Sequence, residues 1–425
     1  MSIDNLSAVI HGKNDLRIEQ RPIPVANANQ LLIRIHTVGI CGSDVHYLNH
    51  GAMGACPIRE PLVLGHEASG IVVEVGKNVQ GFSVGDRVAL EPSLSCKKCF
   101  QCLEKRDNLC LNTRFFGSSR VFPHVHGTLT KYVAHTPSCC FNIPFYYVAL
   151  YLVTSSWIPT MGTLFWLPSF CLPSSSVLPP GYHSPGYLPP RYPLPRYPSA
   201  PPGRLTLGYS PPDYPLSWYS TPTYPPPGLP EHVSMEEGAL LEPLNVAVHA
   251  CRRAGLKPGQ NVLICGAGPI GILNLLTARA LGAKSVLLTD IDEKRLALAQ
   301  DLGADHILNV AGKTPAETAK SVQELFKCQP EVSIECTGVP QSIETAILTT
   351  QSGGVVVLVG LGPNRMELPI LDAAAREVDI RGVFRYSNCY PTALELVANG
   401  RINLKSVTKA HYSLKNHWMH SKELK

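Results

Sequence analysis

The sequence predicts an α/β protein in which a β-rich domain precedes a doubly wound domain with a parallel sheet. Two observations carry this prediction. Between Ser7 and about Pro144, short apolar runs are punctuated by Gly, Pro, Asn and Asp, a pattern typical of strands joined by turns. From Asn261 to about Arg381, buried-type strands alternate with helical stretches, as in βαβ units. With 425 residues, the chain is long enough for both domains and an additional segment.

Composition and charge favour chemistry on small molecules. The formal net charge of +5 is spread thinly, and no run of Lys or Arg is long enough to indicate binding to nucleic acid or a membrane surface. The segment Met1–Leu6 has neither the basic start nor the apolar stretch of a secretory signal, so we expect a cytoplasmic protein. Its 14 cysteines should then be reduced thiols, and those grouped at short spacing are predicted to hold metal.

The first domain is expected over residues 1–144. Its apolar runs at Leu31–Ile35 and Gly70–Val75 have the length of strands and are bounded by turn-forming residues. The parallel-sheet domain is expected over residues 231–380. Its predicted buried strands are Asn261–Cys265, Ser285–Thr289, Val332–Ile334 and Val355–Val359.

Residues 145–230 fit neither pattern. They hold 21 of the 38 prolines and 11 of the 16 tyrosines, with no Lys and no Glu. Proline at this density prevents helix or sheet from propagating, so we expect disorder or polyproline II there. Residues 145–172 are uncharged, but Pro159 and Pro168 argue against a membrane span. A single span would also place the two flanking domains on opposite sides of a membrane, so no membrane association is expected.

A glycine motif marks a dinucleotide site. The strand Asn261–Cys265 runs directly into the hexapeptide of residues 266–271, which opens a helix that extends to about Leu281. Gly266 permits the tight turn, Gly268 lets the backbone approach a pyrophosphate, and Gly271 allows close packing of helix and strand. This context predicts a Rossmann domain.

An acidic residue favours NAD over NADP. Asp290 ends the next strand, where its carboxylate would accept hydrogen bonds from the adenosine ribose and repel a 2′-phosphate. Arg295 leaves the alternative open, because a nearby arginine can serve a phosphate. One turn into the helix, we expect it instead to pack on adenine or ribose.

Four cysteines predict a structural zinc. Cys96, Cys99, Cys102 and Cys110 have the spacing C-x2-C-x2-C-x7-C within a polar loop. Four thiolates suit tetrahedral zinc with no open position, which excludes a substrate from the metal.

A catalytic zinc needs fewer protein ligands and a position for water or substrate. Candidate donors are Cys41 within Gly39–Asp44, His66 with the adjacent Glu67, and Glu242. A lone cysteine is usually a core residue and a His-Glu pair is often a solvated turn, so the order of these motifs along the chain carries the prediction.

The chain resembles the zinc-dependent medium-chain alcohol dehydrogenases, and within them the sorbitol, xylitol and L-idonate 5-dehydrogenase branch. The matching segments are Val38–Tyr47, Gly65–Gly70, Val84–Val88, Glu237–Leu244 and Gly382–Tyr386. The resemblance implies a GroES-like catalytic domain formed by both ends of the chain, a Rossmann domain, two zinc ions per chain and NAD. By family analogy it also implies a homo-oligomer, either a dimer or a tetramer.

The resemblance also implies residue roles. Cys41, His66 and Glu67 would bind the catalytic zinc, and Glu242 would either bind it or hold its water. Ser43 and His46 would relay the proton of the alcohol, and Tyr47, Glu242, Arg385 and Tyr386 would contact the substrate. The implied cofactor contacts are Gly266, Gly268, Ile270, Gly271, Asp290, Arg295, Val359, Leu361 and Val383.

The predicted reaction is transfer of hydride from a secondary alcohol to NAD. The segments Arg114–Ser118 and Phe122–Val125 look more like L-idonate 5-dehydrogenases than like animal sorbitol dehydrogenases. An aldonate would favour Arg114 or Arg385 near its carboxylate, so neutral polyols and aldonates stay equal alternatives. A catalytically impaired scaffold that binds partners through the Pro/Tyr-rich segment is a second reading, and a zinc-free quinone reductase a third. The retained zinc ligands argue against both.

Two segments depart from the family pattern. In the family, Phe141–Pro144 would continue almost directly into Glu231, whereas 86 residues intervene here. They are interpreted as translated non-coding sequence, with a genuine Pro/Tyr-rich insertion as the alternative. The third block, residues 381–425, should return to the catalytic domain. The pattern is lost at Asn416–His420, so we expect the final strand and helix of that domain to be missing.

Overall fold

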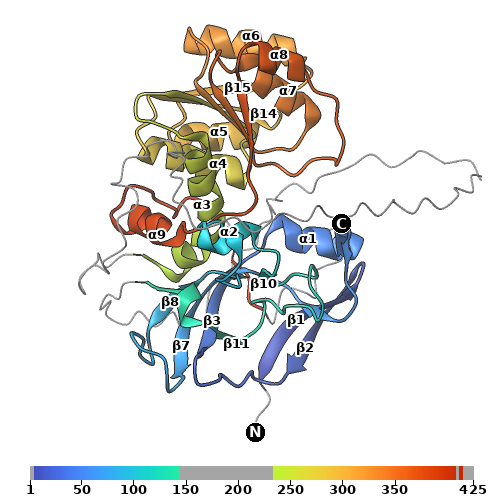
Figure 1. Ribbon diagram of the computed structural model, residues 1–425, viewed down its shortest axis with the longest axis vertical. Coiled ribbons are helices and arrows are strands. Elements are labelled where there is room, and N and C mark those ends of the chain that lie inside the picture. Colours follow the sequence, from blue (N-terminus) through green and yellow to red (C-terminus); the bar gives the residue numbers. More distant parts are fainter. Residues whose placement is uncertain (1–3, 144–232, 408–410, 415–425) are drawn as a thin grey trace, which may run out of the picture. The chain divides into compact units, whose positions relative to one another are not determined.

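The computed structural model describes residues 4–143, 233–407 and 411–414 (Figure 1), all within one unit of the chain. Two expectations concern residues outside these ranges. One is the nature and binding role of the insertion at 145–230, and the other is the loss of the family pattern at 416–420. Among the described helices, none is both long and apolar enough to cross a membrane.

An antiparallel sheet forms the centre of the N-terminal domain. Its strand order is β11-β3-β7-β8-β12. The bounds are β3 (Leu31–Gly39), β7 (Glu67–Val75), β8 (Arg87–Leu90), β11 (Tyr132–His135) and β12 (Cys140–Asn142). Alternate residues of β3, Leu31 and Ile33, are buried and pack with Val72, Val88 and Leu90 in one apolar cluster. Strands therefore form at both of the apolar runs predicted for this domain.

The rest of the N-terminal domain consists of a smaller sheet and several short helices and strands. A smaller sheet has the order β2-β1-β6. Its strands are β1 (Asn5–Gly12), β2 (Asp15–Arg21) and β6 (Leu62–Val63). The other elements are α1 (Gly42–His50), β4 (Ala52–Met53), β5 (Cys56–Pro57), β9 (Ser93–Leu94), α2 (Phe100–Leu103), η1 (Asp107–Leu109), β10 (Arg114–Phe115) and η2 (Pro137–Cys139).

A six-stranded parallel sheet forms the second domain, in the order β15-β14-β13-β16-β17-β18. Its strands are β13 (Asn261–Cys265), β14 (Ser285–Asp290), β15 (His306–Asn309), β16 (Val332–Glu335), β17 (Val355–Leu358) and β18 (Asp379–Gly382). Its helices are α4 (Pro269–Ala280), α5 (Glu293–Asp301), α6 (Pro315–Phe326), α7 (Pro340–Thr349) and α8 (Ile370–Ala375). The strand order reverses between β13 and β16, which places the expected ligand crevice at their carboxyl ends. The predicted fold class is confirmed.

Two helices join the domains. α3 (Met235–Ala254) begins with a capping box in which Ser234 and Glu237 each accept from the other's backbone N–H, and it contacts β7, β8, α4 and α9. In α9 (Tyr390–Ala398), the Tyr390 hydroxyl donates to the Leu90 carbonyl at 2.7 Å. β18 continues to Gly382, so the sixth strand of the parallel sheet runs past residue 380, where the second domain was expected to end.

Candidate metal and cofactor sites

Three possible metal ligands converge at the end of the central sheet. One donor atom each from Cys41, His66 and Glu67 lies within 4.8 Å of the others. Strands β3 and β7 pair with Gly39 opposite Glu67, and Cys41 follows as the N-cap of α1. A Cβ on Gly39 would lie 2.1 Å from Glu67 Oε2, so only glycine leaves room for this carboxylate. Strand pairing therefore brings together donors that are distant in the sequence.

Asp44 orients this cluster. Its Oδ2 accepts from the Cys41 N–H at 3.1 Å, and its Oδ1 accepts from the Gly65 N–H at 3.0 Å. The same Oδ1 lies 3.8 Å from His66 Nδ1, and the side chain is buried. At 3.8 Å this carboxylate attracts the His66 imidazole electrostatically, while its two hydrogen bonds hold the backbone at Cys41 and next to His66.

The electrostatics of the cluster fit a bound cation. Burial, followed by the charge of Asp44, raises the pKa of the Cys41 thiol to about 11. Burial, followed by Cys41, also raises the pKa of the Glu67 carboxyl well above its usual range. A buried thiolate beside a buried carboxylate is unfavourable unless a cation neutralises both. Thiolate, imidazole and carboxylate are the donors that zinc accepts, and three of them leave one position for a further ligand.

Glu242 lies beside the three donors. It is buried on α3, and one carboxylate oxygen accepts from the Tyr386 hydroxyl at 2.9 Å. Burial raises the pKa of this carboxyl, while the nearby His66 opposes the shift. Glu242 is not among the donors that meet within 4.8 Å. The structure thus brings Glu242 and Tyr386 together next to the cluster.

The other candidates for substrate contact differ in their surroundings. The Tyr47 hydroxyl is buried and accepts from the Ser119 N–H at 3.0 Å. The Arg385 guanidinium lies 3.6 Å from the centroid of the Phe115 ring, and this ring lies 5.3 Å from the His66 ring. Arg385 is therefore close to the cluster, while the Tyr47 hydroxyl already has a protein partner.

Ser43 and His46, the two residues predicted to relay the proton of the alcohol, both lie on α1. Hydrogen bonds from Ser43 oppose the rise in the pKa of the Cys41 thiol that burial causes. The His46 ring stacks on His50 with 4.2 Å between centroids. Within the described part of the chain, no hydrogen bond joins Ser43 to His46.

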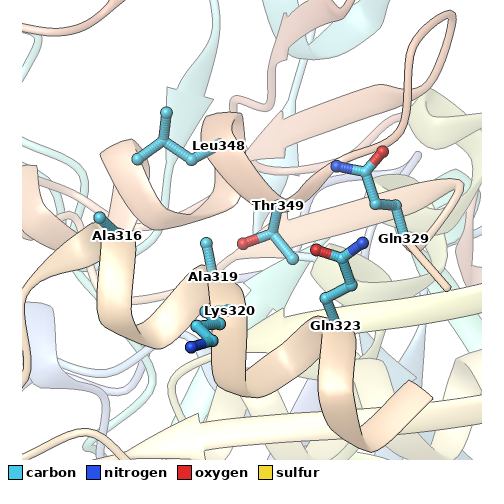
Figure 2. Close-up of a pocket in the computed structure, with 7 residues that line it drawn as sticks. All are labelled: Ala316, Ala319, Lys320, Gln323, Gln329, Leu348 and Thr349. Carbon is cyan, nitrogen blue, oxygen red and sulfur yellow. The ribbon is translucent and has the colours of Figure 1, made fainter. Parts of the chain in front are cut away.

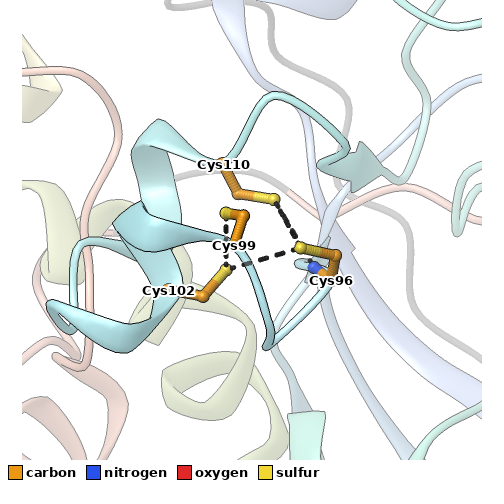
Figure 3. Close-up of side chains that lie close together, drawn as sticks. All are labelled: Cys96, Cys99, Cys102 and Cys110. Atoms are coloured by element: carbon orange, nitrogen blue, oxygen red, sulfur yellow. Dashed lines mark hydrogen bonds between the residues drawn. The ribbon is translucent and has the colours of Figure 1, made fainter. Parts of the chain in front are cut away.

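The four predicted cysteines form a second cluster (Figure 3). We call residues 95–110 the cysteine lobe. The Sγ–Sγ distances are 3.5 Å for Cys96–Cys110, 3.6 Å for Cys99–Cys102 and 4.0 Å for Cys96–Cys102. Sulfurs about 2.3 Å from a tetrahedral zinc are about 3.8 Å apart, so this arrangement fits the metal. A hydrogen bond of 3.0 Å from Ser95 Oγ to Asp107 Oδ1 closes the lobe.

The glycine motif has the geometry of a phosphate-binding turn. Gly266 has φ of +100°, which favours glycine, and a Cβ on Gly271 would lie 1.8 Å from the Gly266 carbonyl oxygen. Gly268 caps α4, and open space surrounds its Cβ position. A helix N-terminus beside free space fits a pyrophosphate.

Asp290 connects this turn to the second strand. One carboxylate oxygen accepts from the Ala267 N–H at 2.8 Å, and it also lies 3.7 Å from Arg295 Nη1. Ile270, Val359 and Val383 are partly buried and Leu361 is exposed. All four follow the carboxyl ends of parallel strands, at the edge where dinucleotides bind in this fold.

A separate pocket of about 290 Å³ lies between α6 and α7 (Figure 2). Its lining includes Lys320, Gln323 and Thr349. None of the site residues predicted from the sequence lines it.

Comparisons with known proteins place the chain in a family. Residues 27–145 match the alcohol dehydrogenase GroES-like domain, and residues 269–399 match the zinc-binding dehydrogenase family. Sorbitol dehydrogenase from Gallus gallus is 36% identical over 414 residues, with 96% of this chain and 90% of that protein covered. The Bos taurus enzyme is 38% identical over 411 residues, with 97% and 90% covered. L-idonate 5-dehydrogenase from Escherichia coli has a TM-score of 0.69 and 28% identity, with 95% and 89% covered.

The chain belongs to the zinc-dependent medium-chain alcohol dehydrogenases, in the branch that contains the polyol dehydrogenases. The resemblance inferred from the sequence is confirmed, and the protein is an oxidoreductase.

Three residues that shape these sites had no predicted role: Asp44, Phe115 and Asn108, whose Nδ2 donates to the Phe384 carbonyl at 2.8 Å. The role of Asp44 could have been predicted, because the side chain of an acidic residue three positions after a helix N-cap often accepts a hydrogen bond from the N-cap backbone N–H. Phe115 and Asn108 act only through contacts with distant segments, which the sequence does not indicate.

Proposed function

We propose that this enzyme oxidises a secondary alcohol of a polyol or an aldonate, of the sorbitol, xylitol or L-idonate class, and reduces NAD. The product is the corresponding ketose or keto acid. The observation that carries the proposal is the meeting of Cys41, His66 and Glu67 beside the hydrogen-bonded pair Glu242 and Tyr386.

Zinc held by the three donors would act as a Lewis acid and lower the pKa of the substrate hydroxyl, and NAD would accept the hydride. Asp44 orients Cys41 and His66 through the hydrogen bonds and the 3.8 Å contact described above. Because Glu242 stands outside the three donors, we propose that it faces the open position and orients the reacting hydroxyl. Tyr386 holds one of its oxygens in place through a 2.9 Å hydrogen bond.

The roles of the other site residues are proposed from their positions near the cluster. Ser43 lies beside Cys41, and His46 stacks on His50, so a proton leaving the site would pass along α1. Arg385 and Tyr386 would contact the substrate. Tyr47 would do so after its hydroxyl exchanges Ser119 for a substrate hydroxyl.

Two zinc ions per chain and a preference for NAD extend the proposal. The sulfur separations in the cysteine lobe support the second zinc. The position of Asp290 next to the glycine turn supports NAD, since its carboxylate would repel a 2′-phosphate. Thiolate ligands need a reducing compartment, so we propose the cytoplasm, and by family analogy a homo-oligomer.

We also propose that the catalytic domain combines residues 1–144 with residues that follow the sixth parallel strand. The stacking of the Phe141 and Tyr390 rings at 4.7 Å supports this division.

The test is NAD reduction by the zinc-replete full chain with D-sorbitol, xylitol and L-idonate, together with metal analysis. Cys41→Ser should lower kcat/KM at least about 1000-fold, because the substrate hydroxyl loses its Lewis acid. Cys328→Ser is the matched control, since Cys328 is exposed and lies outside both clusters. The absence of alcohol-dependent NAD reduction by the wild-type chain, or full activity of Cys41→Ser, would refute the proposal.

A further inference from the structure

Two arginines lie against the ring of Phe384. The guanidinium carbon of Arg385 lies 5.1 Å from the ring centroid, and that of Arg120 lies 5.3 Å from it. Arg385 is partly buried, whereas Arg120 is exposed. Cations on an aromatic ring are attracted by its π-electrons, but this attraction does not neutralise their charge.

Neither guanidinium forms an ion pair or a hydrogen bond with the residues that the structure describes. This absence holds for residues 4–143, 233–407 and 411–414. Four other arginines in these ranges do form ion pairs with aspartates: Arg17, Arg279, Arg376 and Arg381. Burial lowers the pKa of Arg385; Tyr386 and Glu242 oppose this shift, and Arg120 adds to it. Two cations that repel each other, one of them partly desolvated, form a region of positive potential that favours an anion.

This region adjoins Cys41, His66 and Glu67, which form the proposed catalytic cluster. Phe115 contacts both the His66 ring, at 5.3 Å, and the Arg385 guanidinium, at 3.6 Å. The guanidinium is therefore no farther from the His66 ring than the sum of these two distances. Ser119, which precedes Arg120, is hydrogen-bonded to the Tyr47 hydroxyl on α1. A sugar-sized substrate spans a length comparable to the separation of the cluster from Arg385, and Arg120 lies against the same Phe384 ring as Arg385.

We propose that Arg120 and Arg385 together bind an anionic terminal group, a carboxylate or a phosphate, of the substrate. Arg120 is then the residue that selects acidic sugar derivatives over neutral polyols. This inference rests on the proposed function, since it concerns the substrate of the same site. Both anions suit guanidinium groups, which bind their oxygens through paired N–H donors.

Arg114 does not share this position. Its Nη2 donates to the Pro123 carbonyl at 3.3 Å, and the side chain is exposed. Of the two arginines considered from the sequence, only Arg385 belongs to the pair, and its partner is Arg120. Arg114 is therefore a matched control for the loss of one arginine from the same segment.

The experiment compares kcat and KM of the zinc-replete full chain for sorbitol, L-idonate and sorbitol 6-phosphate, in the wild type, Arg120→Gln and Arg114→Gln. The wild type should favour at least one anionic substrate over sorbitol. Arg120→Gln should raise KM for that substrate roughly 10- to 100-fold, as expected for lost hydrogen bonds to a charged group. Its kcat/KM for sorbitol should change less than about twofold, and Arg114→Gln should resemble the wild type.

A rise in KM for L-idonate in Arg120→Gln would identify a carboxylate as the bound group, and a rise for sorbitol 6-phosphate would identify a phosphate. A wild type that oxidises sorbitol but neither anionic substrate overturns the inference and leaves the proposed function intact. An equal loss for all three substrates in Arg120→Gln, or an equal effect of Arg114→Gln, also overturns it. If no alcohol is oxidised, the proposed function fails. Calorimetric titration of L-idonate and sorbitol 6-phosphate into the wild type and Arg120→Gln then decides the inference, because equal binding to both proteins overturns it.

Discussion

The two donor clusters of this enzyme are built in opposite ways. The cysteine lobe takes its four thiols from one continuous segment, Cys96 to Cys110. The catalytic cluster takes Cys41 from the start of α1, His66 and Glu67 from the start of β7, and its neighbour Glu242 from α3. The first cluster can form wherever its own loop folds, whereas the second exists only when the sheet and α3 have assembled.

Their electrostatics differ as well. Backbone N–H groups of Lys98 and Cys99 lower the pKa of the Cys96 thiol to about 6. Burial instead raises the pKa of the Cys41 thiol to about 11. The lobe therefore favours the Cys96 thiolate through its own backbone, but burial raises the pKa of its Cys102 thiol to about 12. Each cluster thus contains a buried thiol that ionises only beside a cation.

One loop connects the two clusters. Asn108 Nδ2 donates to the Phe384 carbonyl at 2.8 Å, and Ser387 Oγ donates to the Lys105 carbonyl at 2.9 Å. Between these two anchor points, Arg385 and Tyr386 face the catalytic cluster. Arg385 has φ of +53°, a conformation that L-residues rarely adopt without restraint. The cysteine lobe thus positions two residues that we propose contact the substrate.

The largest effect expected from this comparison is on stability. Cys99→Ser should lower the zinc content by one ion per chain and the Tm by about 5 to 15 °C, since structural zinc contributes directly to folding. Cys41→Ser should also lose one ion but change Tm far less, because its cluster forms after the sheet. Metal analysis and calorimetry of both variants, with Cys328→Ser as control, test the difference. Equal Tm losses in Cys41→Ser and Cys99→Ser would show that the two clusters stabilise the fold alike.

The same difference explains what the sequence could predict. The spacing of the lobe cysteines and the glycine motif lie in single segments, so local patterns were enough to propose a structural zinc and a dinucleotide turn. The proposed catalytic donors lie far apart in the sequence, from Cys41 to Glu242, and only the family resemblance connected them. Arg120 and Asn108 carried no pattern, because their partner Phe384 is distant in the sequence.

A buried histidine at the end of β11 should make stability depend on pH. His135 Nε2 lies 2.9 Å from the Glu91 carbonyl oxygen, and burial lowers the pKa of His135 to about 4. The unfolded chain, with a histidine pKa of about 6.5, binds a proton that the folded chain excludes. The contribution of His135 to the free energy of unfolding is therefore fully present above pH about 6.5, and it falls by up to about 3 kcal/mol as the pH drops toward 4.

Urea unfolding midpoints at several pH values between 7.5 and 4.5 measure this loss. His135→Gln keeps a possible donor to the Glu91 carbonyl and should show a shallower fall than the wild type. His50→Gln is the control, because His50 is exposed. If the urea midpoint of His135→Gln falls with pH as steeply as that of the wild type, other groups cause the pH dependence.

The smallest effect concerns the connection between the clusters. Asn108→Ala removes the hydrogen bond to Phe384 and should lower kcat/KM by up to about 10-fold, because the loop holds Arg385 and Tyr386 less firmly. Zinc content should not change, since all seven donors of the two clusters stay in place. Asn78→Ala is the matched control, as it removes an exposed hydrogen bond of 2.9 Å to Asn29. Steady-state kinetics and metal analysis separate the outcomes. A loss of zinc in Asn108→Ala would mean that the asparagine supports the lobe itself, whereas reduced activity with full zinc content would mean that the lobe acts on the reaction through this loop.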